Sequence, residues 1–344
     1  MRAFMHEIVG NQKLKNHLCR NILENTLPHA AIIEGPCGSG KHTVAYMAAA
    51  ALACENFASD SHPLPCLECD SCRKILERKS PDVILVGSEE KATIGVDAIR
   101  FLREDVHIYP NDIDHKIYII EDADKMTQQA QNALLLTLEE PPSYVRFFLL
   151  CQSANALLET IRSRAPIFRT EPISTEEIDS YITKADNRAA QMKLTSPSEY
   201  RRLLTAAQNG IGRALEFLDP KAFAPVLENI KLAESLVELA VNKRPPRESV
   251  PLMVKLQGAK RESLKELLLL ISHALRDLIT LKESDSAPLK FYCDRNYAID
   301  LCDRTTLAYL FDINQAVDLA IEENSRNANV RLLVTKLFSS VDLI

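Results

Sequence analysis

The chain has 344 residues, a formal net charge of -6 at pH 7, 46% hydrophobic residues and 26% charged residues. Such a length exceeds one ordinary domain, and the ordinary composition excludes a disordered or low-complexity protein. The acidic balance also excludes a chain that coats nucleic acid by itself, because non-specific DNA affinity comes mainly from neutralised phosphates. We expect a folded protein of two or three domains.

The apolar segments of the chain are short. The longest uninterrupted run, Val44 to Cys54, falls well below the roughly 20 residues that a membrane-spanning helix needs. The first ten residues, MRAFMHEIVG, carry charge where a signal peptide needs a continuous apolar region. We therefore expect a cytoplasmic protein without membrane contact, whose nine cysteines are reduced unless they bind metal.

The first 170 residues alternate short apolar runs with helical stretches, a pattern typical of a parallel sheet covered by helices. Helices are expected at 41–54 and 126–140, the second closed by Pro141 and Pro142. The sequence predicts strands at 30–35, 82–87, 116–121 and 145–151. This part of the chain is predicted to be a nucleotide-binding α/β domain.

Helical patterns replace the strand signals after Thr170. Ser174 and Glu177 form a predicted capping box, which opens a compact helical segment ending near residue 220. Long stretches with helical periodicity then fill residues 221–344, with a polar break at 242–249. The fold class is therefore predicted to be α/β plus all-α.

The stretch GPCGSGKHT, residues 35–43, lies between a predicted strand and a predicted helix. Three of the nine glycines of the chain, Gly35, Gly38 and Gly40, occur in it. Such glycines let backbone N–H groups close around phosphate, and Lys41 would reach the outer phosphates. An ordinary tight turn is the alternative, and the flanking strand and helix favour the phosphate-binding loop.

The residue after the lysine departs from the usual loop. A serine or threonine there gives its hydroxyl to Mg²⁺, which prefers oxygen ligands, whereas His42 offers nitrogen. Thr43 carries a hydroxyl, but one further helical residue rotates it by roughly 100°. The sequence therefore weakens the prediction of magnesium binding.

The run IYIIEDAD places two acids, Glu121 and Asp122, at the end of a predicted strand. In nucleotide hydrolysis one such acid serves the metal and another positions the attacking water, usually as aspartate then glutamate. Here the order is reversed, and the shorter Asp122 would hold the water less well. The acids could instead cap the following helix, but the upstream loop favours a nucleotide site.

Four cysteines follow the predicted helix at 41–54. Cys66, Cys69 and Cys72 form two overlapping C-x2-C units, and Cys54 precedes them by twelve residues. This spacing is typical of a tetrahedral structural zinc site. A redox pair is the competing interpretation, and His62 is the one nearby substitute ligand, favoured only if Cys54 is buried in its helix.

The phosphate loop, the four-cysteine insertion, the acidic strand end and TIRSRAP at 160–166 together resemble the bacterial DNA polymerase III clamp-loader subunits, members of the AAA+ superfamily. Within that family the chain is most similar to the delta-prime type. The resemblance implies a ring of five subunits and three domains: an AAA+ domain with its zinc module at 54–72, a helical lid and a helical collar. Their expected bounds are 1–170, 171–220 and 221–344.

The resemblance also implies roles for particular residues. Arg164 matches an arginine finger that reaches the phosphates of a neighbouring subunit, although Ala165 stands where the family usually has cysteine. Arg213 matches the lid arginine that senses nucleotide, and Ser153 falls near the polar sensor of the fourth strand. A solvated surface role is the alternative for both arginines.

Two functions remain open from the sequence. The first is a clamp-loader subunit that presents Arg164 to an adjacent ATPase while its own ATP hydrolysis is weak or absent. The second is a gamma/tau-type motor that hydrolyses ATP with Mg²⁺ itself. A small-molecule kinase leaves the cysteines and the helical third domain unexplained. Zinc is the expected structural cofactor, and the expected partners are gamma/tau and delta subunits, the sliding clamp and, through the complex, primer-template DNA.

Overall fold

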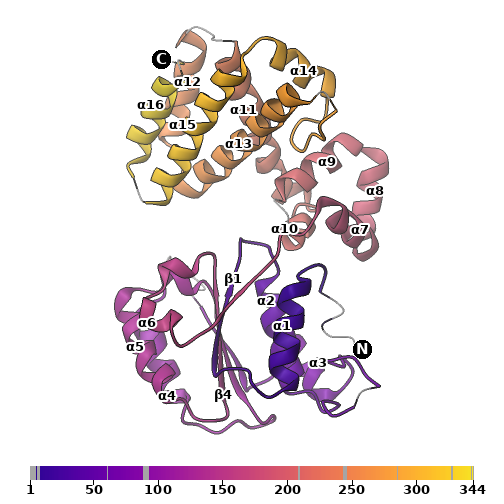
Figure 1. The fold of residues 1–344 in the computed structure, drawn as a ribbon, viewed down its shortest axis with the longest axis vertical. Helices are drawn as coiled ribbons and strands as arrows, with labels where there is room; N and C mark the ends of the chain where they lie inside the picture. The colour runs from indigo at the N-terminus through magenta and orange to yellow at the C-terminus, as the bar shows by residue number, and fades with distance from the viewer. Residues whose placement is uncertain are drawn as a thin grey trace. The chain divides into compact units, whose positions relative to one another are not determined.

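The computed structural model describes residues 5, 8–59, 61–87, 93–207, 210–242, 246–284, 286–326, 328–341 and 343. The chain divides into two compact units, one comprising Met1–Tyr181 with Asn209–Gly212 and the other Ile182–Gln208 with Arg213–Ile344. Each unit has its own core, and Figure 1 shows the sheet in the first and helices in the second. The three-domain division expected from the sequence stays a prediction.

The first unit contains a parallel sheet whose central strands are buried on both faces. Aliphatic and aromatic residues dominate it because helices cover both faces. The strands run in the order β2-β3-β4-β1-β5 across the sheet. Their bounds are β1 (Ala30–Glu34), β2 (Val83–Val86), β3 (Lys116–Ile120), β4 (Val145–Cys151) and β5 (Ile167–Arg169).

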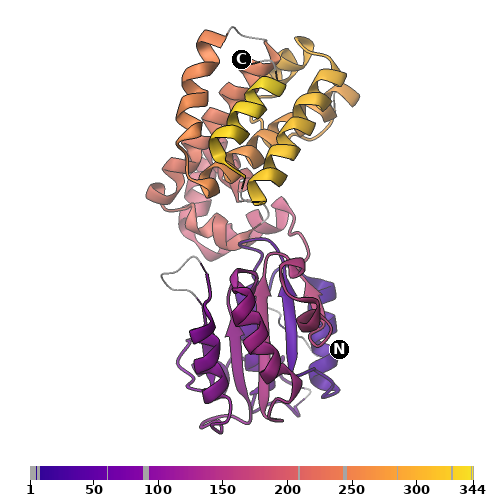
Figure 2. The same cartoon turned by 90° about the vertical axis from the view of Figure 1, so that its left-hand side faces the viewer.

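Alternate side chains of the strands enter two separate cores. Ile33 and Phe148 belong to the core that includes α1, α2 and the cysteine cluster, whereas Ile32 and Phe147 belong to the core of α4 and α5. Figures 1 and 2 show these helices on opposite faces of the sheet. The helices of this unit are α1 (Gln12–Leu23), α2 (Lys41–Leu52), α3 (Asp70–Leu76), α4 (Val96–Asp105), α5 (Gln128–Glu139) and α6 (Glu159–Arg162), with short 3-10 helices η1 (Ala123–Lys125) and η2 (Ala154–Ala156).

The sheet topology determines where polar side chains gather. Strand β1 lies between β4 and β5, and Glu34 at its end is in register with Cys151 and Arg169. All five strands in the described part of the chain are parallel, so their carboxyl ends meet at one edge. Ligands of open α/β sheets bind outside this edge. The loop that follows β1 therefore lies where the sequence placed the nucleotide site.

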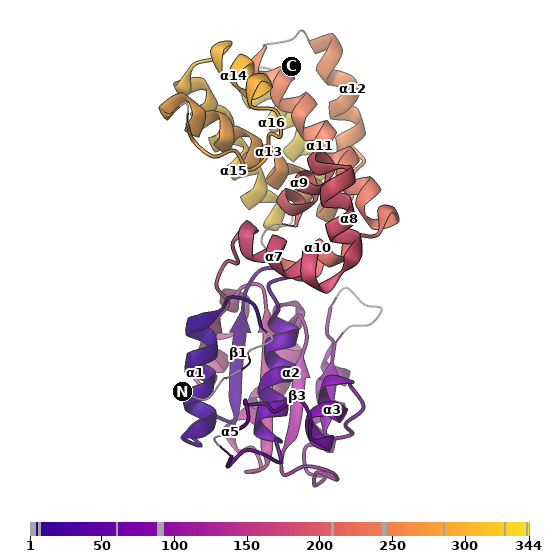
Figure 3. The same ribbon diagram turned by 90° about the vertical axis from the view of Figure 1, so that its right-hand side faces the viewer.

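Four short helices follow the sheet along the chain. The predicted capping box is confirmed: the Ser174 N–H donates to Glu177 Oε2 at 3.0 Å, and the Glu177 N–H donates to Ser174 Oγ at 3.2 Å. Figure 3 shows α8 beside α9. The bounds are α7 (Thr175–Ala185), α8 (Asn187–Thr195), α9 (Pro197–Ala206) and α10 (Ile211–Glu216).

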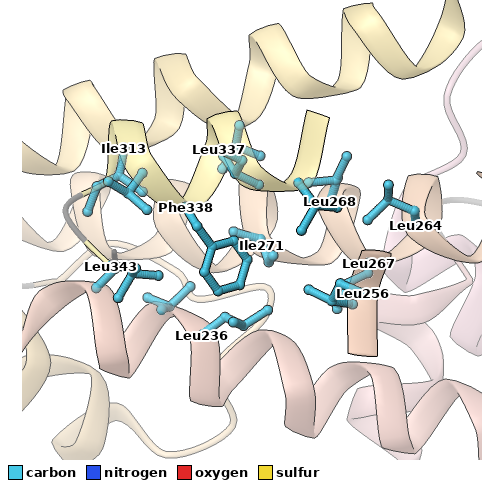
Figure 4. A pocket seen from close by; sticks show the side chains of 15 residues that line it. Leu236, Leu256, Leu264, Leu267, Leu268, Ile271, Ile313, Leu337, Phe338 and Leu343 are labelled. Carbon is cyan, nitrogen blue, oxygen red and sulfur yellow. The ribbon is translucent and has the colours of Figure 1, made fainter. Parts of the chain in front are cut away.

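Long helices pack around an apolar core in the second unit. Leu268, Ile271 and Phe338 converge there from α13 and α16 (Figure 4), around a cavity of about 40 Å³. This volume is far below the roughly 300 Å³ of a small-molecule pocket, so we regard the cavity as a packing gap. The helices are α11 (Pro220–Val241), α12 (Pro246–Gln257), α13 (Arg261–Glu283), α14 (Arg295–Asp303), α15 (Leu307–Ser325) and α16 (Val330–Ser340).

The predicted fold class is confirmed, since a domain built on a parallel sheet is combined with an all-helical remainder. The four strands expected from the sequence are present with ends that differ by at most one residue. Among the described helices, none combines the length and the apolar character that a bilayer crossing requires.

Candidate functional site

The loop between β1 and α2 has a backbone that requires glycine at three positions. Gly38 and Gly40 have φ values of +77° and +85°, in the left-handed region that other residues rarely adopt. At Gly35 the obstacle is space, because a Cβ atom would lie 1.9 Å from Thr170 Oγ1 and 2.8 Å from Ser39 Oγ. The three glycines are thus fixed by backbone geometry and close packing.

Lys41 is the first residue of α2, and its ammonium group lies inside the loop. Its Nζ donates to the carbonyl oxygens of Gly35 at 2.7 Å and Pro36 at 2.8 Å. The residue is only 6% exposed, and burial lowers the pKa of its ammonium group. Lys41 is therefore held where a phosphate group in the loop would meet its charge.

His42 and Glu121 contact each other directly, although 78 residues separate them in the sequence. His42 Nε2 lies 2.7 Å from Glu121 Oε1, which joins the first turn of α2 to the end of β3. Thr43, the next residue on the helix, is exposed. Because His42 supplies nitrogen and already engages the carboxylate, these residues do not fit the Mg²⁺ site that the resemblance implies.

Asp122, the second predicted acid, lies just beyond Glu121 with a left-handed backbone, φ +46°. Its Oδ2 atom is 2.9 Å from Lys125 Nζ, so the carboxylate already has a cationic partner. Both acids are partly exposed. The structure thus brings Glu121 and Asp122 to the predicted strand end and gives each a partner within the chain.

Two acids near the loop were missed by the sequence interpretation. Asp124 accepts the Gln152 N–H at 3.1 Å through Oδ2, and it acts electrostatically on Lys41. Glu34 accepts the Ala154 N–H at 2.9 Å and Arg169 Nε at 2.7 Å. The signal for both was available, since Asp124 belongs to the acidic run after β3 and Glu34 ends the strand before the loop.

Ser153, the predicted sensor, is exposed and directly precedes η2. Strand β4 ends two residues earlier at Cys151, whose carbonyl accepts the Gly35 N–H at 3.1 Å. Burial, Asp124 and Glu34 raise the pKa of the Cys151 thiol to about 12, so it stays protonated. Ser153 thus follows a strand end that is hydrogen-bonded to the base of the loop.

The two predicted arginines each have an acidic partner in their own unit. Arg164 donates from Nη2 to Glu139 Oε1 at 2.9 Å and from Nη1 to the Thr160 carbonyl at 3.0 Å. Arg213 pairs with Glu266 at 3.0 Å, and its guanidinium lies 5.4 Å from the ring centre of Phe217. The Arg164 side chain is 36% exposed and that of Arg213 is 18% exposed.

The four predicted zinc ligands form one cluster. The Sγ atoms of Cys54, Cys66, Cys69 and Cys72 all lie within 4.8 Å of one another, compatible with a tetrahedral ion bound to sulfur at about 2.3 Å. Cys54 lies beyond the end of α2 and joins the group, so the condition that favoured His62 is not met. The donor set fits Zn²⁺.

Backbone N–H groups surround the thiols. The Cys69 N–H points to Cys66 Sγ and the Cys72 N–H to Cys69 Sγ, each at 3.4 Å. Burial alone would raise the pKa of Cys66, but hydrogen bonds from the backbone of Cys69 and Glu68 outweigh it and lower the pKa to about 6. The thiolate form, which metals bind, is thereby favoured at this position.

The amino-acid sequence of the chain is similar to those of known proteins. Residues 10–174 match the family described as "DNA polymerase III, delta subunit". The chain is 32% identical over 213 residues to DNA polymerase III subunit tau of Bacillus subtilis, covering 62% of this chain and 37% of that protein. The chain is also 28% identical to subunit tau of Escherichia coli, and this alignment covers 62% of this chain and 32% of that protein.

Solved structures add a similar neighbour. A gamma subunit-related protein of DNA polymerase III from Thermotoga maritima has a TM-score of 0.42 and 19% identity, covering 96% of this chain and 98% of that one. The alignments with the Bacillus and Escherichia tau subunits span about a third of those proteins, 37% and 32%. By sequence the chain is similar to DNA polymerase III subunits of the delta and gamma/tau kinds, and neither kind is singled out.

Proposed function

We propose that this chain is a delta-prime-type clamp-loader subunit, which helps to place the sliding clamp on primed DNA during replication. In this role it supplies Arg164 to a neighbouring ATPase subunit, and its own ATP hydrolysis is weak or absent. The observation that carries the proposal is the direct contact of His42 Nε2 with Glu121 Oε1 at 2.7 Å. A hydrolytic site of this fold needs a metal ligand and a free acid at these two positions.

The second acid supports the same conclusion. A catalytic base must lie within hydrogen-bond reach of the attacking water, and its carboxylate must be available to accept a proton. The Asp122 carboxylate is instead paired with Lys125 at 2.9 Å. An aspartate is also one methylene shorter than the glutamate that usually holds this water. Positioning of the water is therefore weakened mainly by the shorter side chain, since the exposed pair with Lys125 contributes little.

The exposure of Arg164 supports the proposed finger role. It follows α6 on a surface of the sheet unit, where its side chain is 36% exposed and its guanidinium has two acceptors in the chain. An arginine that a neighbouring subunit supplies to the phosphates during transfer raises kcat by about 10³–10⁵-fold. The chain's contribution to ATP turnover is then made at the site of its neighbour.

The test is DNA-stimulated ATP hydrolysis by a reconstituted clamp loader that contains this chain. We expect Arg164→Ala to lower kcat by at least about a hundredfold. This threshold is set below the roughly 10³-fold that a finger provides at the lower end of its range. Arg162→Ala, at the half-buried last residue of α6, is the matched control and should leave kcat unchanged. Unchanged turnover with Arg164→Ala would exclude the finger.

The alternative is a gamma/tau-type motor that hydrolyses ATP itself. It draws on the names of the relatives, subunit tau and subunit gamma/tau, and on the complete set of Gly35, Gly40 and Lys41. In that case the purified chain alone would hydrolyse ATP, and Lys41→Ala would abolish the turnover. The delta-prime-type proposal expects no such turnover.

The partners follow from the proposed role. We propose gamma/tau and delta subunits in a hetero-pentameric ring, with the sliding clamp and primer-template DNA contacted through the assembled complex. A net charge of -6 agrees with DNA contacts that are shared among subunits. Zinc held by the four cysteines would act structurally, since four thiolates leave no open coordination position for chemistry. The proposed location is the cytoplasm.

A further inference from the structure

Both acids at the end of β3 carry a partner from the chain itself. Glu121 contacts His42 at 2.7 Å, and Asp122 contacts Lys125 at 2.9 Å. A free carboxylate beside the phosphate loop would repel bound phosphates, and in most nucleotide sites of this kind a divalent cation relieves that repulsion. Here hydrogen bonding and ion pairing within the protein relieve it. These contacts therefore reduce part of the repulsion that a metal would otherwise relieve.

The loop retains its own phosphate-binding groups. Lys41 Nζ lies against the Gly35 and Pro36 carbonyls, and the amino terminus of α2 begins at the same residue. Ser39 provides a separate observation that points to a ligand. Ser39 is 5% exposed, and its Oγ atom has no hydrogen-bond partner among the described residues. The same atom would lie 2.8 Å from a Cβ atom built at Gly35.

A buried hydroxyl without a partner is rare in proteins and calls for an explanation. Ser39 Oγ lies beside Gly35, close to the equally unpartnered Thr170 Oγ1, and a phosphate oxygen bound in the loop would supply the missing acceptor. Lys41, Ser39 and the backbone N–H groups of the loop are all donors. The loop therefore offers an anion several donors that do not depend on a metal ligand.

We propose that the loop binds the phosphates of a nucleoside diphosphate or triphosphate without a divalent cation. The His42–Glu121 pair takes the role that the metal has in relatives of this fold that hydrolyse nucleotide. This inference rests on the proposed function for the idea that the site receives nucleotide at all. It explains how a chain can keep every glycine and the lysine of the loop while its metal position is lost.

The experiment measures the Kd of the full-length chain for ADP by calorimetry, without metal and with excess Mg²⁺. Buffers are depleted of divalent cations with a chelating resin, because soluble chelators would also compete for zinc at the cysteine cluster. Zinc content is measured before and after each titration. For the wild-type chain we expect the two Kd values to agree within about twofold.

Three variants test the role of the pair. His42→Ala leaves Glu121 unpaired beside the phosphates, so metal-free ADP binding should weaken about tenfold and Mg²⁺ should restore it. Adding Glu121→Gln to His42→Ala removes the repelling charge, and metal-free binding should return. His107→Ala is the matched control, because His107 lies away from the phosphate loop. The carbonyl of the next residue, Ile108, accepts from Lys116 at the start of β3, whereas Glu121 follows the end of that strand.

The outcomes separate this inference from the proposed function. A wild-type Kd that improves about tenfold or more with Mg²⁺ would overturn metal-free binding. Absence of ADP binding in both buffers would overturn it too, yet would leave the role of Arg164 to its own ATPase test. If Arg164→Ala left the loader's turnover unchanged while metal-free binding held, the finger role would fail and this inference would stand.

Discussion

The guanidinium of Arg164 donates to the carboxylate of Glu139 at 2.9 Å, which ties the turn after α6 to the last residue of α5. Both side chains are partly exposed, at 36% and 47%. An exposed pair of this kind contributes only about 0.2–1 kcal/mol. Glu139 therefore orients the proposed finger without holding it so strongly that phosphate cannot compete.

This relationship predicts a small effect for Glu139→Gln. The variant keeps the length of the side chain and removes its charge, so kcat of the reconstituted loader should fall at most about fivefold, the kinetic equivalent of about 1 kcal/mol. The value of KM for ATP should not change. Glu140→Gln, the next exposed position, is the control. A rise in kcat would mean that Glu139 restrains Arg164 instead of orienting it.

The zinc cluster gives a second prediction. The purified chain should contain one zinc ion, and Cys72→Ser should weaken zinc binding by more than the roughly 10–100-fold that outer-shell changes cost, because a ligand itself is lost. Elemental analysis and competition with a chromophoric chelator measure both quantities. Cys37→Ser and His62→Ala should retain zinc fully. Loss of zinc in His62→Ala would show that the imidazole replaces a thiolate.

The sequence was most informative where a local pattern determines the structure. Strand runs between turn residues located β1 to β4, and the glycine spacing located the phosphate loop. The cysteine spacing located a complete ligand set. Strand β5, with only three residues, carried too little periodicity to be recognised, because its pairing with β1 comes from tertiary packing.

Contacts between distant segments were not predictable from the sequence. His42 and Glu121 were interpreted as two separate departures from the usual motifs, whereas the structure shows that they contact each other. The pairing depends on how β3 ends beside α2, which no local pattern encodes. The acidic partners of Arg164 and Arg213 were likewise invisible, since Glu139 and Glu266 lie on helices whose neighbours are set by the fold.

A third prediction concerns Asp277, a buried carboxylate in α13. Its oxygens accept the backbone N–H groups of Lys290, Phe291 and Tyr292 at 2.7–3.1 Å, and the residue is 4% exposed. Asp277→Asn replaces one acceptor oxygen by an N–H₂ group that faces donors. We expect a loss of about 3 kcal/mol in unfolding free energy, because hydrogen bonds to charged groups contribute about 1.5–3 kcal/mol.

Two measurements check the role of Asp277. Urea unfolding gives the loss of stability, and hydrogen exchange should show faster exchange at the amides of residues 290–292 before the rest of the helical unit responds. The exposed Asp303 provides the matched control, Asp303→Asn, which should change neither quantity. Unaltered exchange at 290–292 in Asp277→Asn would mean that other contacts hold this loop.

The last prediction concerns acid stability and His273 in α13. Burial lowers the pKa of this histidine, and the positive charges of Arg276 and Lys290 lower it further, against the opposing effect of Asp277. The folded state therefore favours the neutral imidazole. Its contribution to stability is fully present above the unfolded-state value, about 6.5, and is lost as the pH falls through that value towards the lowered folded one. Burial lowers the pKa of His115 as well.

We expect the unfolding free energy of the wild-type chain to fall between pH 7.5 and 5.0. The fall should be smaller in His273→Leu, because one of these two histidines is then absent. Urea unfolding at both pH values measures this difference. His107→Ala, at an exposed site, should keep the wild-type slope, and an equal slope in His273→Leu would exclude His273 as a source of the acid sensitivity.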